Sequence, residues 1–211
     1  FGIKLTTATI AQLLYAVVPV IAGIFSYFLL KEKFNLQKLT GIFIGFLGVV
    51  TLIVLPVIGK NSQFSGSLSG DLIILTAIVC FSLYSVLSKK FQKNYSPILL
   101  TTVFAVTTSV VLFVFAVSEF ISNPAWVQNL STSAVIATLY IGIFGGVVYY
   151  LLYQYAIKHG TPVIASMTMF VQPVATFIWA YVLLAERLTS GIIFGGVLAV
   201  IGALIVSVNL K

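Results

Sequence analysis

The sequence has very little charge. Of its 211 residues only 7% are Asp, Glu, Lys or Arg, whereas soluble domains carry about 25%. Surface helices of soluble proteins keep one charged stripe, and the uncharged stretches here are too long to contain one. The low charge therefore excludes a soluble fold. The uncharged stretches are residues 5–30, 39–59, 72–88, 94–118, 120–157, 160–185 and 188–210.

Cysteine and histidine are almost lacking as well. The chain has one of each, Cys80 and His159. A single cysteine excludes a disulfide framework, and the pair cannot build a metal site from these two residue types alone. We therefore expect no metal and no cofactor.

Two further classes of protein, transmembrane barrels and nucleic-acid-binding proteins, are excluded because the chain lacks their sequence patterns. The chain lacks the segments of about 10 residues with alternating polarity that form a transmembrane barrel. Its net charge is +7, but the lysines lie singly or in twos and threes at the ends of apolar stretches. Nucleic-acid binding requires a clustered basic face, so no nucleic-acid partner is expected.

What the sequence has in abundance is apolar residues, which make up 60% of the chain. A helix crosses the bilayer core of about 30 Å with about 20 apolar residues. We therefore predict an all-α integral membrane protein with the lipid bilayer as its partner. Its seven expected spans are residues 7–30, 39–58, 71–88, 97–118, 133–157, 161–185 and 190–209.

The lysines predict the orientation of these spans. Alternate connections fall on opposite sides, and cytoplasmic connections collect Lys and Arg. One side of the membrane would receive three cationic side chains, those of Lys4, Lys60 and Arg187, and the other side would receive the remaining cations. We predict a multi-pass protein of the plasma membrane with a cytoplasmic C-terminus. The cytoplasmic cations would be Lys31, Lys33, Lys38, Lys89, Lys90, Lys93, Lys158 and Lys211.

Two parts of the chain repeat each other at an offset of 154 residues. Residues 19–20 and 173–174 both read Pro-Val, and Leu-Leu-x-Glu occurs at 29–32 and at 183–186. Gly41 and Gly48 correspond to Gly195 and Gly202. Matched prolines, glycines and glutamates are rarely coincidental in apolar sequence. Residues 7–58 and 161–209 are therefore copies of one unit.

The two copies are expected to be inverted. An odd number of spans separates them, and Lys4 is predicted outside whereas its counterpart Lys158 is predicted inside. Inverted repeats are typical of secondary transporters. The second copy begins near Gly70, so the first would begin about 84 residues before Phe1 (70 − 154). We therefore expect three further spans at the N-terminus, without which the chain would not transport.

These motifs resemble those of the EamA-type branch of the drug/metabolite transporter superfamily. The resemblance rests on the doubled order of alanine-rich helix, proline, Leu-Leu-x-Glu and glycine-rich helix. It implies a ten-helix carrier of five plus five helices with a central cavity, of which these spans would be helices 4 to 10. It also implies two repeats, 1–60 and 71–211, joined by a linker at 61–70.

Several motif residues have an expected physical role. Pro19 and Pro173 should kink their helices and free a carbonyl group towards protein or a wet cavity. The glycines of the last helix in each copy should let helix backbones pack closely. Glu32 and Glu186, beside Lys33 and Arg187, favour an ion pair or a cap at the membrane rim over a proton-coupling role.

Uncharged polar and aromatic residues within the spans are the candidates for a transport cavity. Amide and phenol groups in hydrocarbon seek partners in another helix or in a substrate. Tyr27, Tyr95 and Tyr181 are instead expected to anchor the interface. The predicted cavity-lining or substrate-binding residues are Gln12, Tyr15, Pro19, Tyr84, Tyr150, Tyr153, Gln154, Met169, Gln172, Pro173, Thr176 and Trp179.

The function predicted from these features is secondary transport by alternating access. The cargo would be a small metabolite, amino acid or drug-like compound, and the direction export. An enzyme is not expected, because acids, bases and histidine lie at span ends or in loops. The alternative is a passive channel or a structural membrane subunit that transports nothing. A homodimer is left open.

Overall fold

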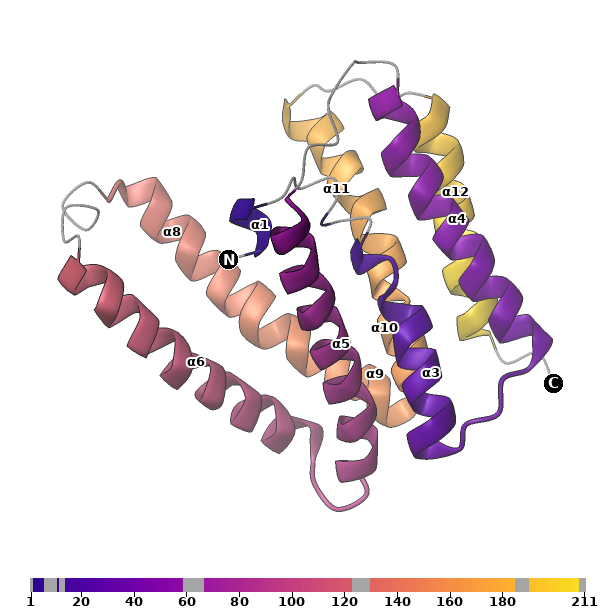
Figure 1. Ribbon diagram of the computed structural model, residues 1–211, viewed down its shortest axis with the longest axis horizontal. Helices are drawn as coiled ribbons and strands as arrows, with labels where there is room; N and C mark the ends of the chain where they lie inside the picture. Colours follow the sequence, from indigo (N-terminus) through magenta and orange to yellow (C-terminus); the bar gives the residue numbers. More distant parts are fainter. Residues whose placement is uncertain are drawn as a thin grey trace. The chain divides into compact units, whose positions relative to one another are not determined.

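The described residues of this computed structural model form helices and the turns that join them (Figure 1). They are residues 2–5, 11, 14–58, 67–122, 130–184 and 190–208. Gln12, Glu186 and Arg187 lie outside them, so the predictions on these three residues stay predictions.

The helices follow the expected spans closely. Their bounds are α1 Gly2–Leu5, α3 Val18–Leu30, α4 Leu36–Ile58, α5 Leu68–Phe91, α6 Pro97–Ser122, α8 Thr132–Tyr140, η1 Ile141–Val148, α9 Tyr149–His159, α10 Pro162–Ser166, α11 Thr168–Leu184 and α12 Ser190–Ser207. The segment η1 is a π-helix between α8 and α9, so that residues 132–159 run as one long helix.

Four of the described helices are long and apolar enough to cross a membrane, namely 68–91, 97–122, 132–159 and 190–207. Shorter apolar helices occupy 18–30, 36–51 and 162–176. These seven segments correspond one to one with the seven predicted spans. The prediction of an all-α membrane protein is confirmed.

Side-chain caps explain where several helices begin. Ser131 precedes α8, and its hydroxyl accepts a hydrogen bond of 3.2 Å from the N–H of Ala134. Thr161 does the same for α10 with Ile164 at 3.2 Å. Such caps satisfy N–H groups that have no partner within the helix. At its other end, α3 stops where Lys31 adopts a left-handed conformation with φ of 55°.

The chain divides into two compact units. The first consists of residues 1–87 and 160–211, and the second of residues 88–159. Both copies of the sequence repeat therefore lie in the first unit. Its buried apolar core consists of Ala16, Ile42, Val49, Val163, Met167, Phe170, Ala199, Ala203 and Val206.

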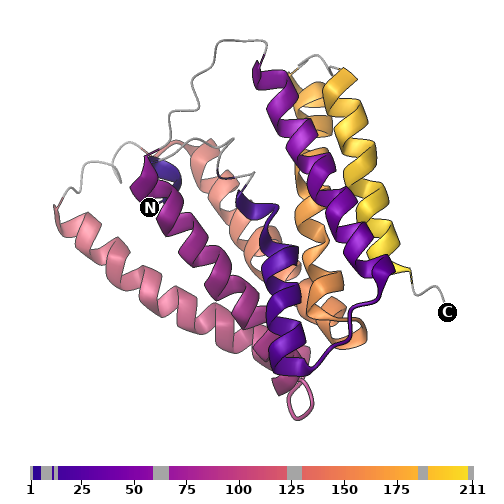
Figure 2. The same cartoon turned by 45° about the vertical axis from the view of Figure 1, so that its right-hand side comes forward.

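The closest packing in the first unit joins α4 to α12, which lie side by side (Figure 2). A Cβ atom added at Gly41 would lie 3.0 Å from the carbonyl oxygen of Gly202, and one added at Gly48 would lie 2.8 Å from that of Gly195. The helices run antiparallel, because the later residue of α4, Gly48, meets the earlier residue of α12, Gly195. Small residues let the two backbones approach this closely.

These two contacts are related by the repeat in the sequence. Gly41 corresponds to Gly195 and Gly48 to Gly202, so the Gly41–Gly202 contact is the counterpart of the Gly48–Gly195 contact. Such an exchange of equivalent residues is the pattern of a two-fold axis. The two copies thus pack on each other through the same face.

The first helix of each copy is broken, and only in the first copy does the break lie within one turn before the proline, where a kink was predicted. In the first copy a turn at Ala16 and Val17 precedes α3, and Pro19 lies in the first turn of that helix. In the second copy the break lies at Met167, and Pro173 lies inside α11. Proline at the start of a helix loses no hydrogen bond, which explains its place in α3.

Both breaks use the same tight turn. The N–H groups of Val17 and Met167 donate at 3.0 and 3.1 Å to the carbonyl groups three residues earlier. The hydroxyl groups of Ser166 and Thr168 also bind carbonyl groups three residues back, at 2.7 and 2.9 Å. Hydroxyl groups that compete for backbone carbonyls favour a bend in a helix.

Candidate functional site

The predicted cavity residues of the first unit differ widely in exposure. Pro19 and Pro173 are buried, and Tyr15 and Tyr84 are half-buried. Met169 is buried, with 8% of its surface exposed. Three more lie on the exposed side of α11: Gln172, Thr176 and Trp179.

The second unit brings three predicted residues together on α9. Tyr150 lies against Phe104 of α6, with their ring centroids 4.6 Å apart. Tyr153 stacks on Tyr149 at 6.0 Å, and Tyr149 meets Tyr150 edge to face at 5.4 Å. Offset and edge-to-face ring pairs are favourable contacts. These rings form a contiguous aromatic layer, in which the Phe104–Tyr150 pair joins α6 to α9.

Gln154, one turn further along α9, is the centre of a buried polar network. It is fully buried, and its amide nitrogen donates to the hydroxyl group of Ser88 at 3.0 Å. Its side-chain oxygen accepts 2.6 Å from the amide of Gln92, which also donates to the Gln154 carbonyl group at 2.9 Å. The Gln92 side-chain oxygen is buried without a hydrogen-bond partner.

The same end of α9 is capped by a lysine. The Lys89 ammonium group donates to the carbonyl oxygens of Ile157 and Lys158 at 2.9 and 3.0 Å. A cation at a helix C-terminus compensates unpaired carbonyl groups and the negative end of the helix dipole. Lys89 and Gln154 therefore tie the end of α5 to the end of α9.

Sequence reasoning missed the partners in this network. Ser88 and Gln92 stand at the end of a span, beside lysines, where polar residues usually face water. Phe104 is one of many apolar residues in α6. The available signal was a pair of polar residues one helical turn apart, Ser88 and Gln92, at the membrane side where the predicted span 133–157 ends just after Gln154.

The rim glutamate of the first copy forms an ion pair, but with a different lysine than its sequence neighbour. Glu32 accepts from the Lys38 ammonium group at 2.7 Å, and both side chains are 15% exposed. Lys38 lies in the first turn of α4, and its ammonium group is also 5.9 Å from the ring centroid of Phe34. The pair holds the short connection between α3 and α4.

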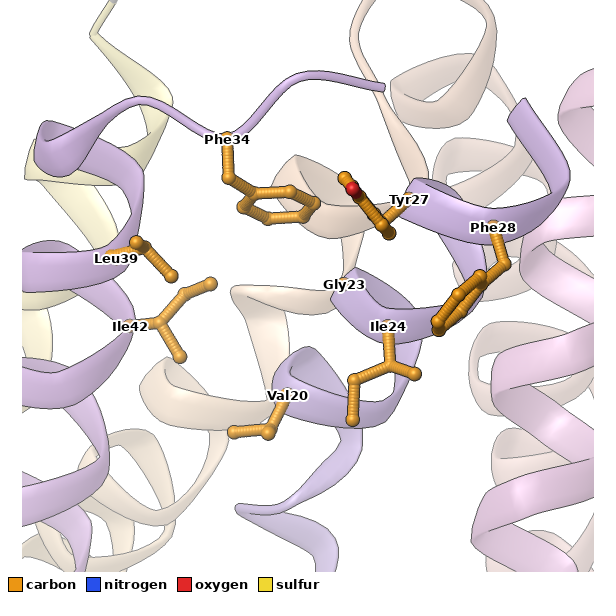
Figure 3. Close-up of a pocket in the computed structure, with 8 residues that line it drawn as sticks. All are labelled: Val20, Gly23, Ile24, Tyr27, Phe28, Phe34, Leu39 and Ile42. Carbon is orange, nitrogen blue, oxygen red and sulfur yellow. The ribbon is translucent and has the colours of Figure 1, made fainter. Parts of the chain in front are cut away.

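Beside this connection, α3 and α4 border an apolar groove with a volume of about 280 Å³ (Figure 3). Phe34 lies across the groove, 3.2 Å from where a Cβ atom on Gly23 would be. None of the groove residues is among the predicted cavity residues. They are Val20, Gly23, Ile24, Tyr27, Phe28, Phe34, Leu39 and Ile42.

Apolar helices, an inverted repeat and paired broken helices define a class, the multi-pass membrane proteins built like inverted-repeat carriers. The model of the EamA-like transporter family matches residues 1–54 and 68–208. The chain belongs to this family. The resemblance inferred from the doubled motifs is thereby confirmed.

Relatives of the chain occur in bacteria and plants. It is 31% identical to the Uncharacterized transporter YyaM of Bacillus subtilis over 206 residues, which cover 98% of this chain and 66% of that protein. It is 27% identical to the WAT1-related protein At3g02690, chloroplastic, of Arabidopsis thaliana, covering 98% of this chain and 50% of that one. The chain thus spans two thirds or less of these relatives.

The fold also matches a solved structure. One crystal structure aligns with 97% of this chain and 68% of its own chain, with a TM-score of 0.78 and 20% sequence identity. At this identity the match concerns the fold alone.

Proposed function

We propose that the chain forms the larger part of a secondary carrier for small solutes, working by alternating access. The observation that carries this proposal is the exchange of equivalent contacts between α4 and α12. A protein made of two inverted copies has two arrangements of similar energy, one open to each side. Broken helices in both copies supply segments that can move.

The repeat and the distribution of lysines also support the domain boundaries and the membrane orientation that we propose. Residues 1–60 would be the end of the first repeat, 61–70 a linker and 71–211 the second repeat. The protein would lie in the plasma membrane with its C-terminus in the cytoplasm, as the distribution of lysines favours. It would act without a catalytic step.

The chemistry of the predicted cavity residues favours particular cargo. Aromatic rings and uncharged amides suit an amphipathic metabolite, an amino acid or a neutral drug-like compound, which the carrier would export. The layer of Tyr149, Tyr150 and Tyr153 supports an aromatic wall, whereas Gln154 is already committed to its network. Exposed Gln172 is a better candidate for direct contact with a substrate.

The experiment is solute counterflow in liposomes. The chain would be reconstituted alone and with the N-terminal extension that the repeat predicts, and screened with labelled amino acids and nucleosides. A carrier shows saturable uptake that unlabelled solute on the far side accelerates. Uptake that rises linearly and ignores the far side would indicate a channel, and flux from the chain alone would contradict the expected extension.

A further inference from the structure

The apolar groove between α3 and α4 lies beside the connection that joins the two helices, and this connection carries lysines. Lys31 and Lys33 are exposed in the connection between the two helices, and Lys38 is held by Glu32. Residues 31–38 contain these three lysines and one glutamate, so that the rim has a net charge of +2 (3 − 1). The groove itself is lined by apolar side chains (Figure 3).

The groove has the depth of one lipid leaflet. Its residues on α3 run from Val20 to Phe28 and precede Lys31 by three to eleven residues. At about 1.5 Å per residue this corresponds to roughly 4–16 Å below the lysine. Half of the hydrocarbon core measures about 15 Å. An acyl chain in the groove would therefore place its headgroup at the lysines.

The second copy of the repeat lacks both features in its sequence. Phe177 stands where the first copy has Gly23, so that a large ring replaces the residue that leaves room beneath Phe34. Ala185 and Ile192 stand where the first copy has Lys31 and Lys38, whereas Arg187 matches Lys33, so that residues 185–192 carry no net charge (1 − 1). The glycine and the net positive charge therefore occur together in the sequence of the first copy, whose rim is predicted to face the cytoplasm.

We propose that this groove and its lysines form a binding site for one anionic phospholipid, with an acyl chain between α3 and α4 and the phosphate at Lys31 and Lys33. The apolar lining matches the chain, and the net positive rim matches a negative headgroup. The cytoplasmic leaflet is the one that carries anionic lipids. The ring of Phe34, in the connection, covers the upper part of the acyl chain.

The test is quenching of a single tryptophan by brominated lipids. Phe34→Trp places the probe at the groove, and Trp126→Phe with Trp179→Phe removes the two native tryptophans. Vesicles contain brominated phosphatidylglycerol or brominated phosphatidylcholine with the same acyl chains. We expect the probe to prefer the anionic lipid, by about fivefold for each lysine that contacts the headgroup.

Substitutions separate the headgroup from the acyl chain. Lys31→Gln with Lys33→Gln should abolish the preference, whereas Lys90→Gln with Lys93→Gln removes as much charge from the other unit and should retain it. Gly23→Phe copies the second repeat and should reduce quenching by both lipids. Leu39→Trp, with Phe34 restored, should report the same preference from the α4 side.

The control probe is Phe113→Trp, because Phe113 is 69% exposed on α6. This probe should be quenched equally by both lipids. Equal quenching at residue 34 by the two lipids would overturn the proposal, because the lysines would then select nothing. Quenching at residue 113 without any at residue 34 would also overturn it, because protein would then cover the groove. Circular dichroism and size-exclusion profiles show which variants fold.

Discussion

Several threonine hydroxyl groups within the helices are satisfied along their own helix. The side chains of Thr51, Thr76 and Thr138 each donate at 2.8 Å to the carbonyl group four residues earlier. Thr176, a predicted cavity residue, does the same to Gln172 at 3.0 Å. Lipid offers no hydrogen-bond partner, so these bonds let polar residues occupy apolar spans without a functional role.

The glycines differ in how much space surrounds them, and this predicts opposite effects of alanine. A Cβ atom on Gly48 would collide with the backbone of Ala199 and lie 2.8 Å from the Gly195 oxygen, whereas Gly146 has nothing within 4 Å. Gly48→Ala should lower the free energy of unfolding by about 1–3 kcal/mol. Gly146→Ala should leave it unchanged or raise it, because alanine favours helix by about 1 kcal/mol.

Thermal unfolding in detergent measures both glycine variants. A lower midpoint for Gly48→Ala alone supports the close crossing of α4 and α12. Equal midpoints for the two variants would contradict it.

Replacing two glutamines by leucine should affect the free energy of unfolding unequally. Gln154→Leu would remove the amide that donates to the Ser88 hydroxyl group and one of the two acceptors of the Gln92 amide, at a cost of about 1–3 kcal/mol. Gln172→Leu replaces an exposed side chain and should not destabilise the protein. Denaturant titration of both variants measures this difference, and a destabilised Gln172→Leu with an unaffected Gln154→Leu would refute the network.

At the level of helices, much of the fold could be predicted from the sequence, because hydropathy and length decide which segments cross a bilayer. The predicted spans 39–58 and 97–118 correspond to α4 at Leu36–Ile58 and α6 at Pro97–Ser122. Breaks within a helix depend on local hydrogen bonds instead. The turn at Met167 therefore lies away from the position that Pro173 indicated, whereas the turn before Val18 lies within one turn of Pro19.

The candidate site was less predictable than the spans. Helix periodicity placed Tyr150 and Gln154 on one face of the fifth span, and both do meet partners there. Periodicity cannot say which residue of another helix lies opposite, so Phe104 and Ser88 were missed. The groove was missed for another reason, since an apolar side chain that borders a groove has the same sequence signature as one that faces lipid.

The connection between α3 and α4 predicts unequal roles for its lysines. Lys38→Gln breaks the ion pair with Glu32, in which both side chains are only 15% exposed, and should cost about 1 kcal/mol. Lys33→Gln removes an exposed lysine of the same connection and should cost nothing measurable. Unfolding midpoints at low salt compare the two, and a larger loss for Lys33→Gln would mean that Glu32 pairs with its sequence neighbour.

For the whole molecule, the orientation in the membrane is the main prediction. Lys90 lies at the end of α5 and Glu119 near the end of α6, so one membrane crossing separates them. In intact cells a charged thiol reagent should label Glu119→Cys and spare Lys90→Cys. The background is Cys80→Ser, because the native cysteine is exposed. The reverse labelling pattern would place the C-terminus outside.

The crossing of α4 and α12 has a consequence for how such a chain could arise. Gly41 and Gly48 of α4 contact the repeat counterparts of each other, Gly202 and Gly195, so the same helix face packs against an inverted copy of itself. A single short ancestor inserted in both directions could therefore have assembled through this face as an antiparallel homodimer. Joining the two genes would then have preserved the interface.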